Sequence, residues 1–424
     1  MKILLTTRRE VIEQRNPIAI LDLAAYLRMF GNSVDCYYLD QLHNQKIQSK
    51  VYDVVGLSVL QALKENTPVK DAIYLKKKFR TEVVVGGKWT QTIRDAQKTF
   101  LISNGIKVCV GPGEQYFVNR DIDFKEYPSW DRRDFETLND VRADIMSTRG
   151  CPYHCHFCHN TEKNLSFFSA ERTADNIELL FQLGVKRIFF CDDIFTLRVS
   201  HMEGLYNALQ QRNINIEKRN EFFTHVNHIN QETIKWIKIY KPAQVNVGIE
   251  SGDDRMLGLM GKGFDSKTAL EKLKMLYEGI QLPIGTLFII GFPGETEESL
   301  RNTLHFIKRI QSIGGGWVSY YQPVRGTKGY EMAISRDKRM KVGHRNTSIT
   351  YVDPNLTKKI LFKYNYMMMD FSQNGFLRRR LIYTLIDILP YWLLTGVRLV
   401  RQKKRLKDSI NNYNILPRSH DHKN

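Results

Sequence analysis

Three cysteines stand close together in one short stretch of this chain. Cys151, Cys155 and Cys158 are spaced Cys-x-x-x-Cys-x-x-Cys, directly after a short strand-like run that ends at Thr148. Three thiolates on one loop can share one metal cluster. Iron-sulfur clusters are usually held by four thiolates, so a local set of three leaves one iron without a protein ligand. The spacing therefore predicts a cluster whose open iron binds a small molecule.

A structural zinc loop is the alternative interpretation, because zinc also binds Cys and His. Three histidines, His154, His156 and His159, lie beside the cysteines. Zinc modules, however, generally pair two short ligand couples across a longer spacer, and the sequence has no second couple. The pattern favours a cluster over a zinc ion.

The loop resembles the Cys-x-x-x-Cys-x-aromatic-Cys motif of the radical S-adenosylmethionine superfamily, with Phe157 at the aromatic position. The resemblance implies a 4Fe-4S cluster whose open iron is chelated by the amino and carboxylate groups of S-adenosylmethionine. It also implies cleavage to a 5'-deoxyadenosyl radical, with electrons from an external donor of the flavodoxin or ferredoxin type. In such enzymes the cofactor carries the hard chemistry and the protein positions it.

The length and composition of the chain limit the number of domains and the cellular compartment in which this loop is expected. A chain of 424 residues is too long for one ordinary core, so we expect two or three domains. The remaining cysteines, Cys36, Cys109 and Cys191, stand singly in apolar runs and suggest no disulfides. The apolar run at the N-terminus is too short for a signal peptide, which predicts a cytoplasmic, reducing compartment. A net charge of +18 predicts attraction to something anionic, either nucleic acid or an acidic membrane surface.

Residues 1–125 alternate short apolar runs with amphipathic segments of helical length. This pattern predicts an α/β domain with a doubly wound, Rossmann-like parallel sheet, whose ligands bind at the carboxyl ends of the strands. The residues expected at those ends are mostly small and would let a large planar ligand approach the backbone. They are Ser58, Gly86, Gly87, Gly111 and Gly113, followed by Glu114.

This half of the chain resembles the cobalamin-binding domain found in many radical S-adenosylmethionine enzymes. The shared elements are a Ser-x-Leu-like element at Ser58, the Gly-Gly pair at Gly86 and the Gly-x-Gly-Glu turn at Gly111. The Asp-x-His-x-x-Gly signature of cobalamin mutases is absent. The resemblance therefore implies cobalamin with no protein histidine on cobalt, and a domain that has lost its cofactor is the alternative.

After a polar connector at residues 126–142, a second alternating series covers residues 143–330. Its six strand-helix steps are fewer than the eight of a full barrel and fit the superfamily's six-stranded partial barrel. The resemblance implies that Asp192 and Asp193 hold the amino end of S-adenosylmethionine, although many members have Gly-Gly-Glu there. It also implies that Glu250 bonds the ribose hydroxyls and that Ser251, next to it, is a cofactor-binding residue.

Two further groups stand at carboxyl strand ends of this series. Gly291, Phe292 and Pro293 resemble an element that lies beside the adenine, whereas the acids that follow suit a helix cap or first turn, namely Glu295, Glu297 and Glu298. After the third strand, polar groups either face substrate or serve as turn and cap residues. These groups are His225, Asn227 and His228.

Residues 331–424 are expected to form a C-terminal helical region. Its first basic cluster lacks the interleaved aromatics of a nucleic-acid groove and predicts a solvated loop. The cluster consists of Arg336, Lys338, Arg339, Lys341 and Arg345. Residues 381–400 are nearly all apolar and have basic flanks. This pattern predicts a helix that lies in the interface of an anionic membrane, on the cytoplasmic side of that membrane. Packing of this helix on the barrel is the alternative.

These observations together favour a cobalamin-dependent radical enzyme that methylates an unactivated carbon of a small-molecule or lipid-like substrate, without nucleic acid. A radical cyclase or rearrangement enzyme is the first alternative. A membrane-associated binding protein with a structural cluster is the second. Methylthiolation of transfer RNA is disfavoured, because Cys36 and Cys109 cannot supply the three N-terminal cysteines that a second cluster needs. The sequence assigns no catalytic side chain.

Overall fold

A computed structural model describes residues 1–9, 17–43, 47, 51–60, 66–138, 144–160, 162–282, 284–337, 340 and 349–371. The chain divides into two compact units. One unit holds residues 1–147 and 166–186, and the other holds residues 148–165 together with the described residues from 187 onward.

The first unit contains a five-stranded parallel sheet of order β2-β1-β3-β4-β5. Strand order reverses between β1 and β3, which is the topological switch of a doubly wound sheet. Hydrophobic side chains are buried on both faces: Leu57, Val83 and Val85 on one, and Val54 and Val84 on the other. The strands are β1 (Lys2–Thr7), β2 (Ser33–Tyr38), β3 (Val54–Ser58), β4 (Glu82–Gly86) and β5 (Ile106–Val108).

Helices cover both faces of this sheet, as parallel strands require. Leu75 of α3 and Leu101 of α4 pack on the face of Leu57, whereas Tyr116 and Phe117 of α5 pack on the face of Val54. The helical elements are α1 (Ile18–Met29), η1 (Leu39–His43), α3 (Thr67–Phe79), η2 (Lys88–Gln91), α4 (Asp95–Ser103), α5 (Gly113–Val118), α6 (Arg132–Leu138) and α7 (Ala170–Gln182). The stretch expected as a connector thus includes α6, and Trp130 within it is buried.

A second parallel sheet has the order β13-β12-β11-β10-β9-β6. Its strands are β6 (Asp144–Ile145), β9 (Ile188–Phe190), β10 (Asn220–Thr224), β11 (Gln244–Glu250), β12 (Ile284–Ile290) and β13 (Gly314–Tyr320). A two-stranded sheet joins β7 (Thr148–Arg149) and β8 (Ser166–Phe167). The predicted α/β fold, a doubly wound domain followed by a six-stranded partial barrel, is confirmed.

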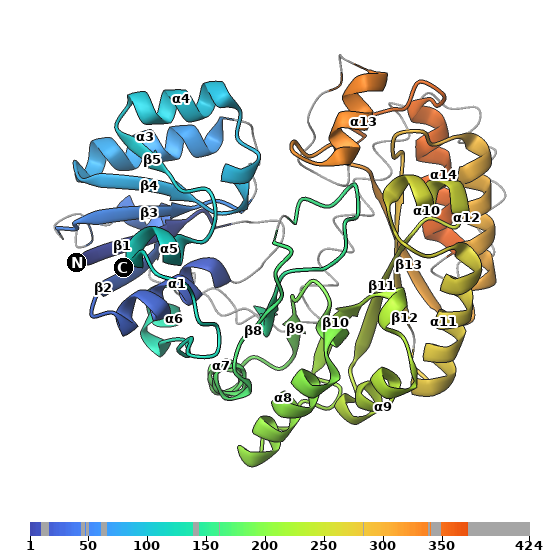
Figure 1. Cartoon of the computed structure of the whole chain (residues 1–424), viewed down its shortest axis with the longest axis horizontal. Coiled ribbons are helices and arrows are strands. Elements are labelled where there is room, and N and C mark those ends of the chain that lie inside the picture. The colour runs from blue at the N-terminus through green and yellow to red at the C-terminus, as the bar shows by residue number, and fades with distance from the viewer. Residues whose placement is uncertain are drawn as a thin grey trace, which may run out of the picture. The chain divides into compact units, whose positions relative to one another are not determined.

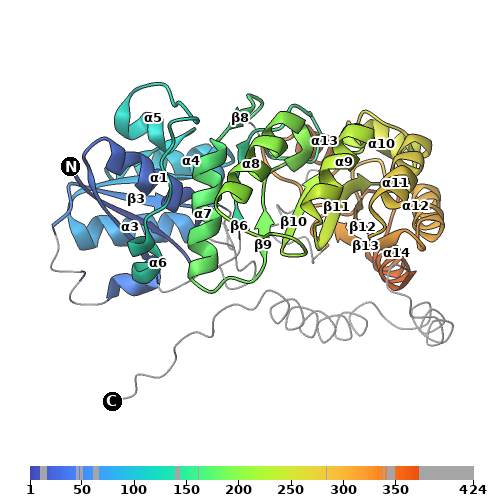
Figure 2. The ribbon, with the colours of Figure 1, turned by 90° about the horizontal axis from the view of Figure 1, so that it is seen from below.

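Helices of the second unit follow one another along one face of its strands (Figures 1 and 2). Those helices are α8 (Val199–Gln211), α9 (Gln231–Tyr240), α11 (Ser266–Ile280) and α12 (Glu297–Arg309). Shorter elements lie at the strand ends: η3 (Phe195–Leu197), η4 (Val226–His228), α10 (Asp254–Met260) and α13 (Lys328–Arg336). Side-chain caps fix where several helices begin, because Asn230, Asp265 and Thr296 each accept a backbone N–H three residues on.

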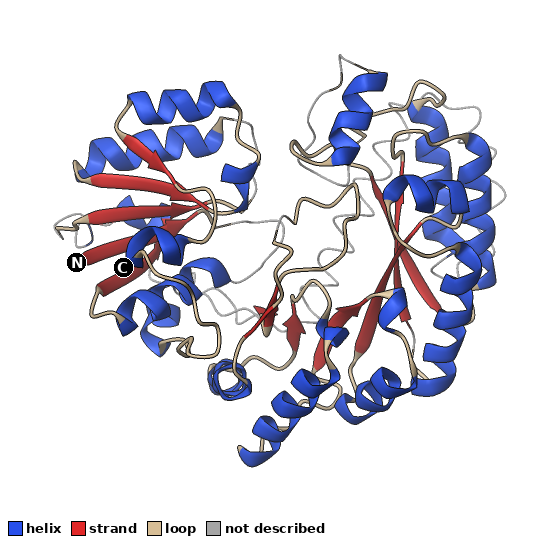
Figure 3. Ribbon diagram, in the orientation of Figure 1, coloured by secondary structure: helices blue, strands red, loops and turns tan. Residues whose placement is uncertain are grey.

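The strands of this unit alternate in burial. In β12, Ile284, Thr286, Phe288 and Ile290 are buried, whereas the residues between them are partly exposed. Side chains alternate between the two faces of a strand, so one face is covered by helices and the other is more open. We call this second face the inner face. Figure 3 shows the loop after β7 on the inner face, opposite the helices.

The C-terminal region corrects one prediction. Arg336 does not lie in a solvated loop: it ends α13 and forms an ion pair with the fully buried Asp353. The four other residues of that basic cluster lie outside the described residues, as does the interfacial helix predicted at 381–400. The region is helical again at α14 (Lys358–Phe371). Among the helices of the described residues, none is long and apolar enough to cross a membrane.

Candidate functional site

The three cysteines of the predicted cluster lie in the loop that follows β7, and all three thiols are free. Cys151 and Cys155 are partly buried and Cys158 is exposed. Burial raises the pKa of the Cys151 and Cys155 thiols, whereas the nearby Lys262 ammonium lowers that of Cys155. Thiols in such surroundings become good ligands only when a bound metal stabilises the thiolate.

His156 anchors the cysteine loop to two helices. Its backbone N–H donates to Met260 O at 2.8 Å, and its Nδ1 lies 2.7 Å from Leu259 O at the end of α10. Its carbonyl accepts the N–H of Gly329, in α13, at 2.7 Å. Because a carbonyl oxygen only accepts, Nδ1 carries a proton and donates it to Leu259 O, so His156 acts here as a structural residue.

The donor set suits the predicted cluster. Within the described residues, no three His, Cys, Asp or Glu side chains converge as the ligands of one metal ion. In a cubane cluster each thiolate binds a different iron, so such convergence is not needed. Gly150 shapes the start of the loop: its φ is +96°, and a Cβ there would come within 2.2 Å of Asn164 O.

Both acids predicted at the end of β9 reach the cysteine loop. Asp192 is buried and accepts the backbone N–H of Thr148 at 3.1 Å. Asp193 accepts from Asn160 Nδ2 at 2.6 Å, and the Asn160 N–H lies 3.4 Å from Cys158 Sγ. The sequence did not single out Asn160, which connects the acid pair to the third cysteine. Contact of these acids with S-adenosylmethionine stays a prediction.

Glu250 ends β11 in an unusual backbone conformation. Its φ is +71°, and the register with β12 shifts between Gly248 and Glu250. Gly248 leaves room for the carboxyl, because a Cβ there would lie 2.5 Å from Glu250 Oε1. Non-glycine residues with positive φ are often found at functional sites. Burial raises the pKa of Glu250, and Lys262, at 3.3 Å, opposes that rise.

Lys262 is a site residue that sequence reasoning missed. Its side chain is almost fully buried, with Nζ 5.8 Å from the centre of the Phe157 ring. It lies in the turn after α10, between Gly261 and Gly263, which both have positive φ. The sequence signal that could have identified Lys262 is a lysine between two glycines at the end of a helix. The structure thus brings together a cation, the Glu250 carboxyl and the aromatic residue of the cysteine motif.

Gly291, Phe292 and Pro293 stand at the end of β12, as predicted. Phe292 is buried against Tyr321, with ring centres 4.8 Å apart. Glu295 is not a helix cap: it is buried, and it accepts hydrogen bonds from the Gly291 N–H at 3.1 Å and from the Ser299 hydroxyl. Burial raises the pKa of Glu295 to about 7. Thr296 is the cap of α12, and Glu297 and Glu298 occupy its first turn.

Ser251, predicted to bind the cofactor, is buried, and its hydroxyl is hydrogen-bonded within the unit. Its hydroxyl lies 3.0 Å from the Thr303 hydroxyl and accepts the N–H of Asp253 at 3.1 Å. These bonds fix the turn between β11 and α10. Contact of Ser251 with the cofactor stays a prediction.

The end of β10 contributes an aromatic stack. His225 lies parallel to Tyr153 of the cysteine loop, with ring centres 3.9 Å apart and planes 13° apart. His228 and Phe264 meet these rings edge-on. Burial, then Lys262 and His228, lower the pKa of His225 to about 3, so the imidazole is neutral. The structure therefore places His225 beside the cysteine loop. Asn227 lies there too, because its backbone N–H donates to His225 Nδ1 and its side chain forms a hydrogen bond with Tyr153.

The predicted cofactor residues of the first unit gather at one edge of its sheet. Ser58 ends β3 directly beside Gly86 in β4. Gly87 has φ +90°, and a Cβ there would lie 2.5 Å from Val59 O, so the close turn requires glycine. Gly111 also has positive φ, with open space where a Cβ would be. Among these glycines, Gly111 faces open space, whereas Gly87 is packed against the backbone of Val59.

The last two predicted residues of this unit have structural partners. A Cβ on Gly113 would press on Leu23, with a closest approach of 3.0 Å. Glu114 is buried and accepts from the Tyr127 hydroxyl at 2.6 Å. Binding of cobalamin by any of the six residues stays a prediction.

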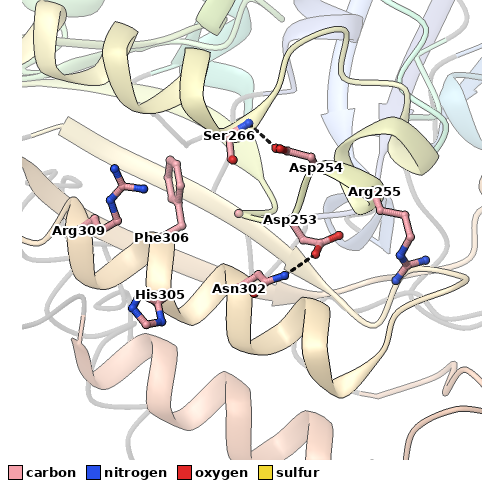
Figure 4. A pocket seen from close by; sticks show the side chains of 9 residues that line it. Asp253, Asp254, Arg255, Ser266, Asn302, His305, Phe306 and Arg309 are labelled. Carbon is pink, nitrogen blue, oxygen red and sulfur yellow. Dashed lines mark hydrogen bonds between the residues drawn. The ribbon is translucent and has the colours of Figure 1, made fainter.

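A cavity of about 370 Å³ lies on the helical side of the second unit, lined by α10, α11 and α12 (Figure 4). Its acids already serve as helix caps or backbone acceptors: Asp253 accepts from Asn302 and Met256, and Asp254 accepts the N–H of Ser266. We do not assign this cavity to the chemistry, because none of its lining residues belongs to the cysteine loop or the inner face.

Comparison with known proteins agrees with the geometry. The Radical SAM superfamily model matches residues 145–307. An uncharacterized methyltransferase from Pyrococcus horikoshii is 30% identical over 55% of this chain and 51% of its own length. A tRNA-2-methylthio-N(6)-dimethylallyladenosine synthase from Pelagibacter ubique is 23% identical over 72% of this chain and 71% of its own. The chain thus spans about half the length of the first of these relatives.

Solved structures share the fold of both units. The cobalamin-dependent S-adenosylmethionine radical enzyme OxsB, with aqua-cobalamin and S-adenosylmethionine bound, has a TM-score of 0.61 at 17% identity, over 80% of this chain and 55% of its own. The radical S-adenosylmethionine methyltransferase TsrM from Kitasatospora setae, with cobalamin and a 4Fe-4S cluster bound, has a TM-score of 0.61 at 15% identity. This match covers 87% of this chain and 81% of TsrM.

The motif, the site and the family match agree on the class. Residues 145–307 of this chain belong to the radical S-adenosylmethionine superfamily, and the chain shares the fold of OxsB and TsrM. Membership implies an enzyme that uses a 4Fe-4S cluster and S-adenosylmethionine.

Proposed function

We propose that this protein is a cobalamin-dependent radical S-adenosylmethionine methyltransferase that methylates an unactivated carbon. Cys151, Cys155 and Cys158 would hold the cluster. Together the bound cofactors would supply a deoxyadenosyl radical that removes hydrogen and a methyl group that replaces it. The observation that carries the proposal is the meeting of the cysteine loop with Glu250 and Lys262 at the inner face of the barrel.

The residues around the loop have positioning roles in this proposal. Asp192 and Asn160 hold the loop against the end of β9, so the three thiols keep their spacing. Glu250 and Lys262 are a buried acceptor and a buried donor beside Cys155, suited to the hydroxyl and carboxylate groups of S-adenosylmethionine. Ion pairs at low dielectric hold a fixed geometry, which favours precise placement of a reactive group.

Cobalamin and methyl transfer are supported by the likeness of 80% of this chain to OxsB and 87% to TsrM, and by the small residues at the strand ends of the first unit. A radical cyclase or rearrangement enzyme with the same cofactors is the alternative. Several curated relatives are named as methylthiolation enzymes, but the first unit offers only Cys36 and Cys109, not three cysteines for a second cluster.

A small-molecule or lipid-like substrate, a flavodoxin- or ferredoxin-type donor and attachment to an anionic membrane surface belong to the same proposal. The interfacial helix at 381–400 motivates the membrane part. Flotation of the protein with anionic liposomes tests it. Recovery of all protein in the unbound fraction at low salt would remove the membrane part and leave the rest unchanged.

Reaction products decide the main proposal. The anaerobically reconstituted protein, given reductant, methyl-labelled S-adenosylmethionine and a lipid extract, should form 5'-deoxyadenosine and a labelled product. Cys155→Ala should abolish 5'-deoxyadenosine, whereas Cys36→Ala, in β2 of the first unit, should not. Full production by Cys155→Ala would sink the cluster assignment. Cleavage without label in any product would favour the cyclase alternative.

A further inference from the structure

Asn160 is a buried residue that contacts two exposed groups of the candidate site. It is 8% exposed and stands two residues after Cys158, the third cysteine. Cys158 is exposed, and so is Asp193, which follows β9. Buried side-chain amides are hydrogen-bonded in most proteins, because an unpaired polar group away from water costs free energy. The hydrogen-bond partners of Asn160 therefore indicate the role of this buried amide.

The side chain of Asn160 uses one donor and one acceptor at the same time. Its Nδ2 donates to Asp193 Oδ2 at 2.6 Å, and its Oδ1 accepts the backbone N–H of Glu162 at 3.2 Å. A carboxylate only accepts and a backbone N–H only donates, so these two partners fix the orientation of the amide. Aspartate at this position would lack the donor, and leucine, which has a similar size, would lack both groups. Asparagine therefore matches both partners.

Asn160 and its partner Glu162 also connect the first and third cysteines. The Asn160 backbone N–H donates to Cys158 Sγ at 3.4 Å. The Glu162 carbonyl accepts the N–H of Cys151 at 3.1 Å. The Asn160 side chain joins these two contacts, because its Oδ1 holds the Glu162 backbone. Loss of the amide would therefore loosen both ends of the cysteine motif.

The contacts of Asn160 with Asp193 and with Cys158 act on different properties of the site. An amide donor has no net charge, so it holds the Asp193 carboxylate in place without neutralising it. A carboxylate held in this way attracts a cationic amino group. At Cys158, the N–H dipole favours the additional negative charge of a reduced cluster, and hydrogen bonds to the sulfurs help to set the reduction potential. One residue thus contacts the expected cofactor-binding acid and a cluster thiol.

We propose that Asn160 is a positioning residue that couples the binding of S-adenosylmethionine at Asp193 to the reduction of the cluster at Cys158. Its amide keeps the Asp193 carboxylate beside the third cysteine, where the amino group of S-adenosylmethionine would bind. Its backbone N–H keeps a donor on the Cys158 sulfur. The inference rests on the proposed function for the cluster and for S-adenosylmethionine, and it assigns a further residue to that site.

A double-mutant cycle tests whether Asn160 acts through Asp193. Asn160→Leu and Asp193→Ala should each weaken binding of S-adenosylmethionine by about tenfold, measured by anaerobic equilibrium dialysis of the reconstituted full-length chain without reductant. The double variant should bind like Asp193→Ala, because Asn160 then has no carboxylate to position. Asn207→Leu, exposed on α8, is the matched control and should bind like wild type. Losses that multiply in the double variant, or unchanged affinity in Asn160→Leu, would overturn the coupling.

The midpoint potential of the cluster tests the contact with Cys158. Without its two side-chain bonds Asn160 no longer fixes its N–H on the sulfur, so Asn160→Leu should lower the potential. A tenfold weaker reduction equilibrium corresponds to about 59 mV for one electron, and a shift of this order is expected in a redox titration followed by electron paramagnetic resonance. Asp193→Ala removes a negative charge and should not lower the potential. Equal potentials of wild type and Asn160→Leu would overturn the role at Cys158.

Iron content and thermal midpoints separate these effects from lost assembly or lost folding. A variant that folds and assembles the cluster should hold about four irons per chain. If Asn160→Leu holds fewer, Asn160→Ser takes its place in both measurements, because the smaller hydroxyl also removes the bond to Asp193 and leaves a polar side chain in the buried position. The same two outcomes then decide the inference.

Failure of this inference and failure of the proposed function give different results. Wild-type protein that forms 5'-deoxyadenosine, together with an Asn160→Leu variant of unchanged affinity and potential, would overturn the inference alone. Protein that shows the expected effects of Asn160→Leu but transfers no methyl group would overturn the proposed methyltransferase and leave the role of Asn160 standing. Wild-type protein that assembles no cluster would overturn both.

Discussion

The ammonium group of Lys262 lies 3.3 Å from Oε1 of Glu250, and both side chains are buried beside the cysteine loop. Buried ion pairs are weak evidence for stability as pairs, but loss of one partner leaves an uncompensated charge. The positive φ of Glu250 adds backbone strain that the surrounding contacts must hold. The pair therefore couples local stability to the geometry of the site.

Lys262→Met should destabilise the fold by about 3 kcal/mol at pH 8, because the Glu250 carboxylate then stays buried without a cation. The loss should shrink toward pH 5. Without Lys262 the pKa of Glu250 rises further above its unfolded value, and such a group favours folding at low pH and loses that effect as pH rises. Urea unfolding measures the loss in free energy of unfolding at pH 8 and at pH 5. Lys241→Met breaks an exposed ion pair with Glu217 and should cost at most about 1 kcal/mol; equal losses in the two variants would contradict the prediction.

Glu295 makes a second pH-dependent contribution. Its pKa is raised from 4.5 to about 7 by burial, so the folded state holds this proton more tightly than the unfolded state. The associated stability is present below pH 4.5 and is lost as pH rises through about 7, a change of about 3 kcal/mol. Glu295→Gln should therefore be less sensitive to pH than wild type. Thermal midpoints between pH 5 and 8 provide the check, with the exposed Glu298→Gln as control. Parallel curves for Glu295→Gln and wild type would exclude the titration of this carboxyl.

Sequence patterns predicted the elements that depend on local order. Strand-helix alternation located both sheets, because buried parallel strands are continuous apolar runs bounded by turn residues. The cysteine spacing and the acids at strand ends could also be identified in the sequence, because they too depend on residues that are close together in the chain. Asp192 and Asp193 lie just after β9 and Glu250 ends β11, and the structure brings each of them to the cysteine loop or its immediate neighbours.

Features that depend on pairing between distant segments were missed. Lys262 is an ordinary surface residue type until the fold buries it beside Glu250. Arg336 was expected in solvent because its buried partner, Asp353, follows far along the chain. The short helix α10 was also missed, since seven residues with Gly258 inside show little periodicity, although its cap Asp253 was a usable signal. Tertiary contacts decide such cases, and one sequence does not specify them.

Cobalamin binding is expected to depend on Gly86 at the end of β4. A Cβ there would only touch Cys109 Cβ at 3.7 Å, so Gly86→Ala should fold normally. Gly86→Leu would place a bulky side chain at the strand end and should lose the corrinoid. The measurement is the anaerobic absorption spectrum after refolding with cobalamin and desalting. Wild type and Gly86→Ala should retain about one corrinoid per chain. Absence of corrinoid in all three would point to a domain that has lost its cofactor.

Asp353 connects the C-terminal region to the turn after β12. It is fully buried and accepts hydrogen bonds from the Gly294 N–H at 2.7 Å, from Arg336 Nε at 2.6 Å and from the Tyr351 hydroxyl at 3.2 Å. Burial alone would raise its pKa, but these partners outweigh burial and lower it. Its contribution to stability is therefore present above its unfolded pKa and is lost as pH falls through the lower folded value.

Asp353→Ala should cost about 3 kcal/mol at pH 7, because it leaves the Arg336 charge and the Gly294 N–H without their acceptor. It should also weaken binding of S-adenosylmethionine by about tenfold, since the turn of Gly291 and Phe292 loses a support. Urea unfolding and anaerobic equilibrium dialysis without reductant measure the two effects. Glu331→Gln, exposed on α13, is the control and should change neither. Arg336→Met should cost less than Asp353→Ala, because the Arg336 side chain is 38% exposed and its loss leaves Asp353 with the Gly294 N–H and Tyr351 hydroxyl as donors. Unchanged affinity in a destabilised Asp353→Ala protein would mean that the turn keeps its shape without this carboxylate, and Asp353 would then be structural only.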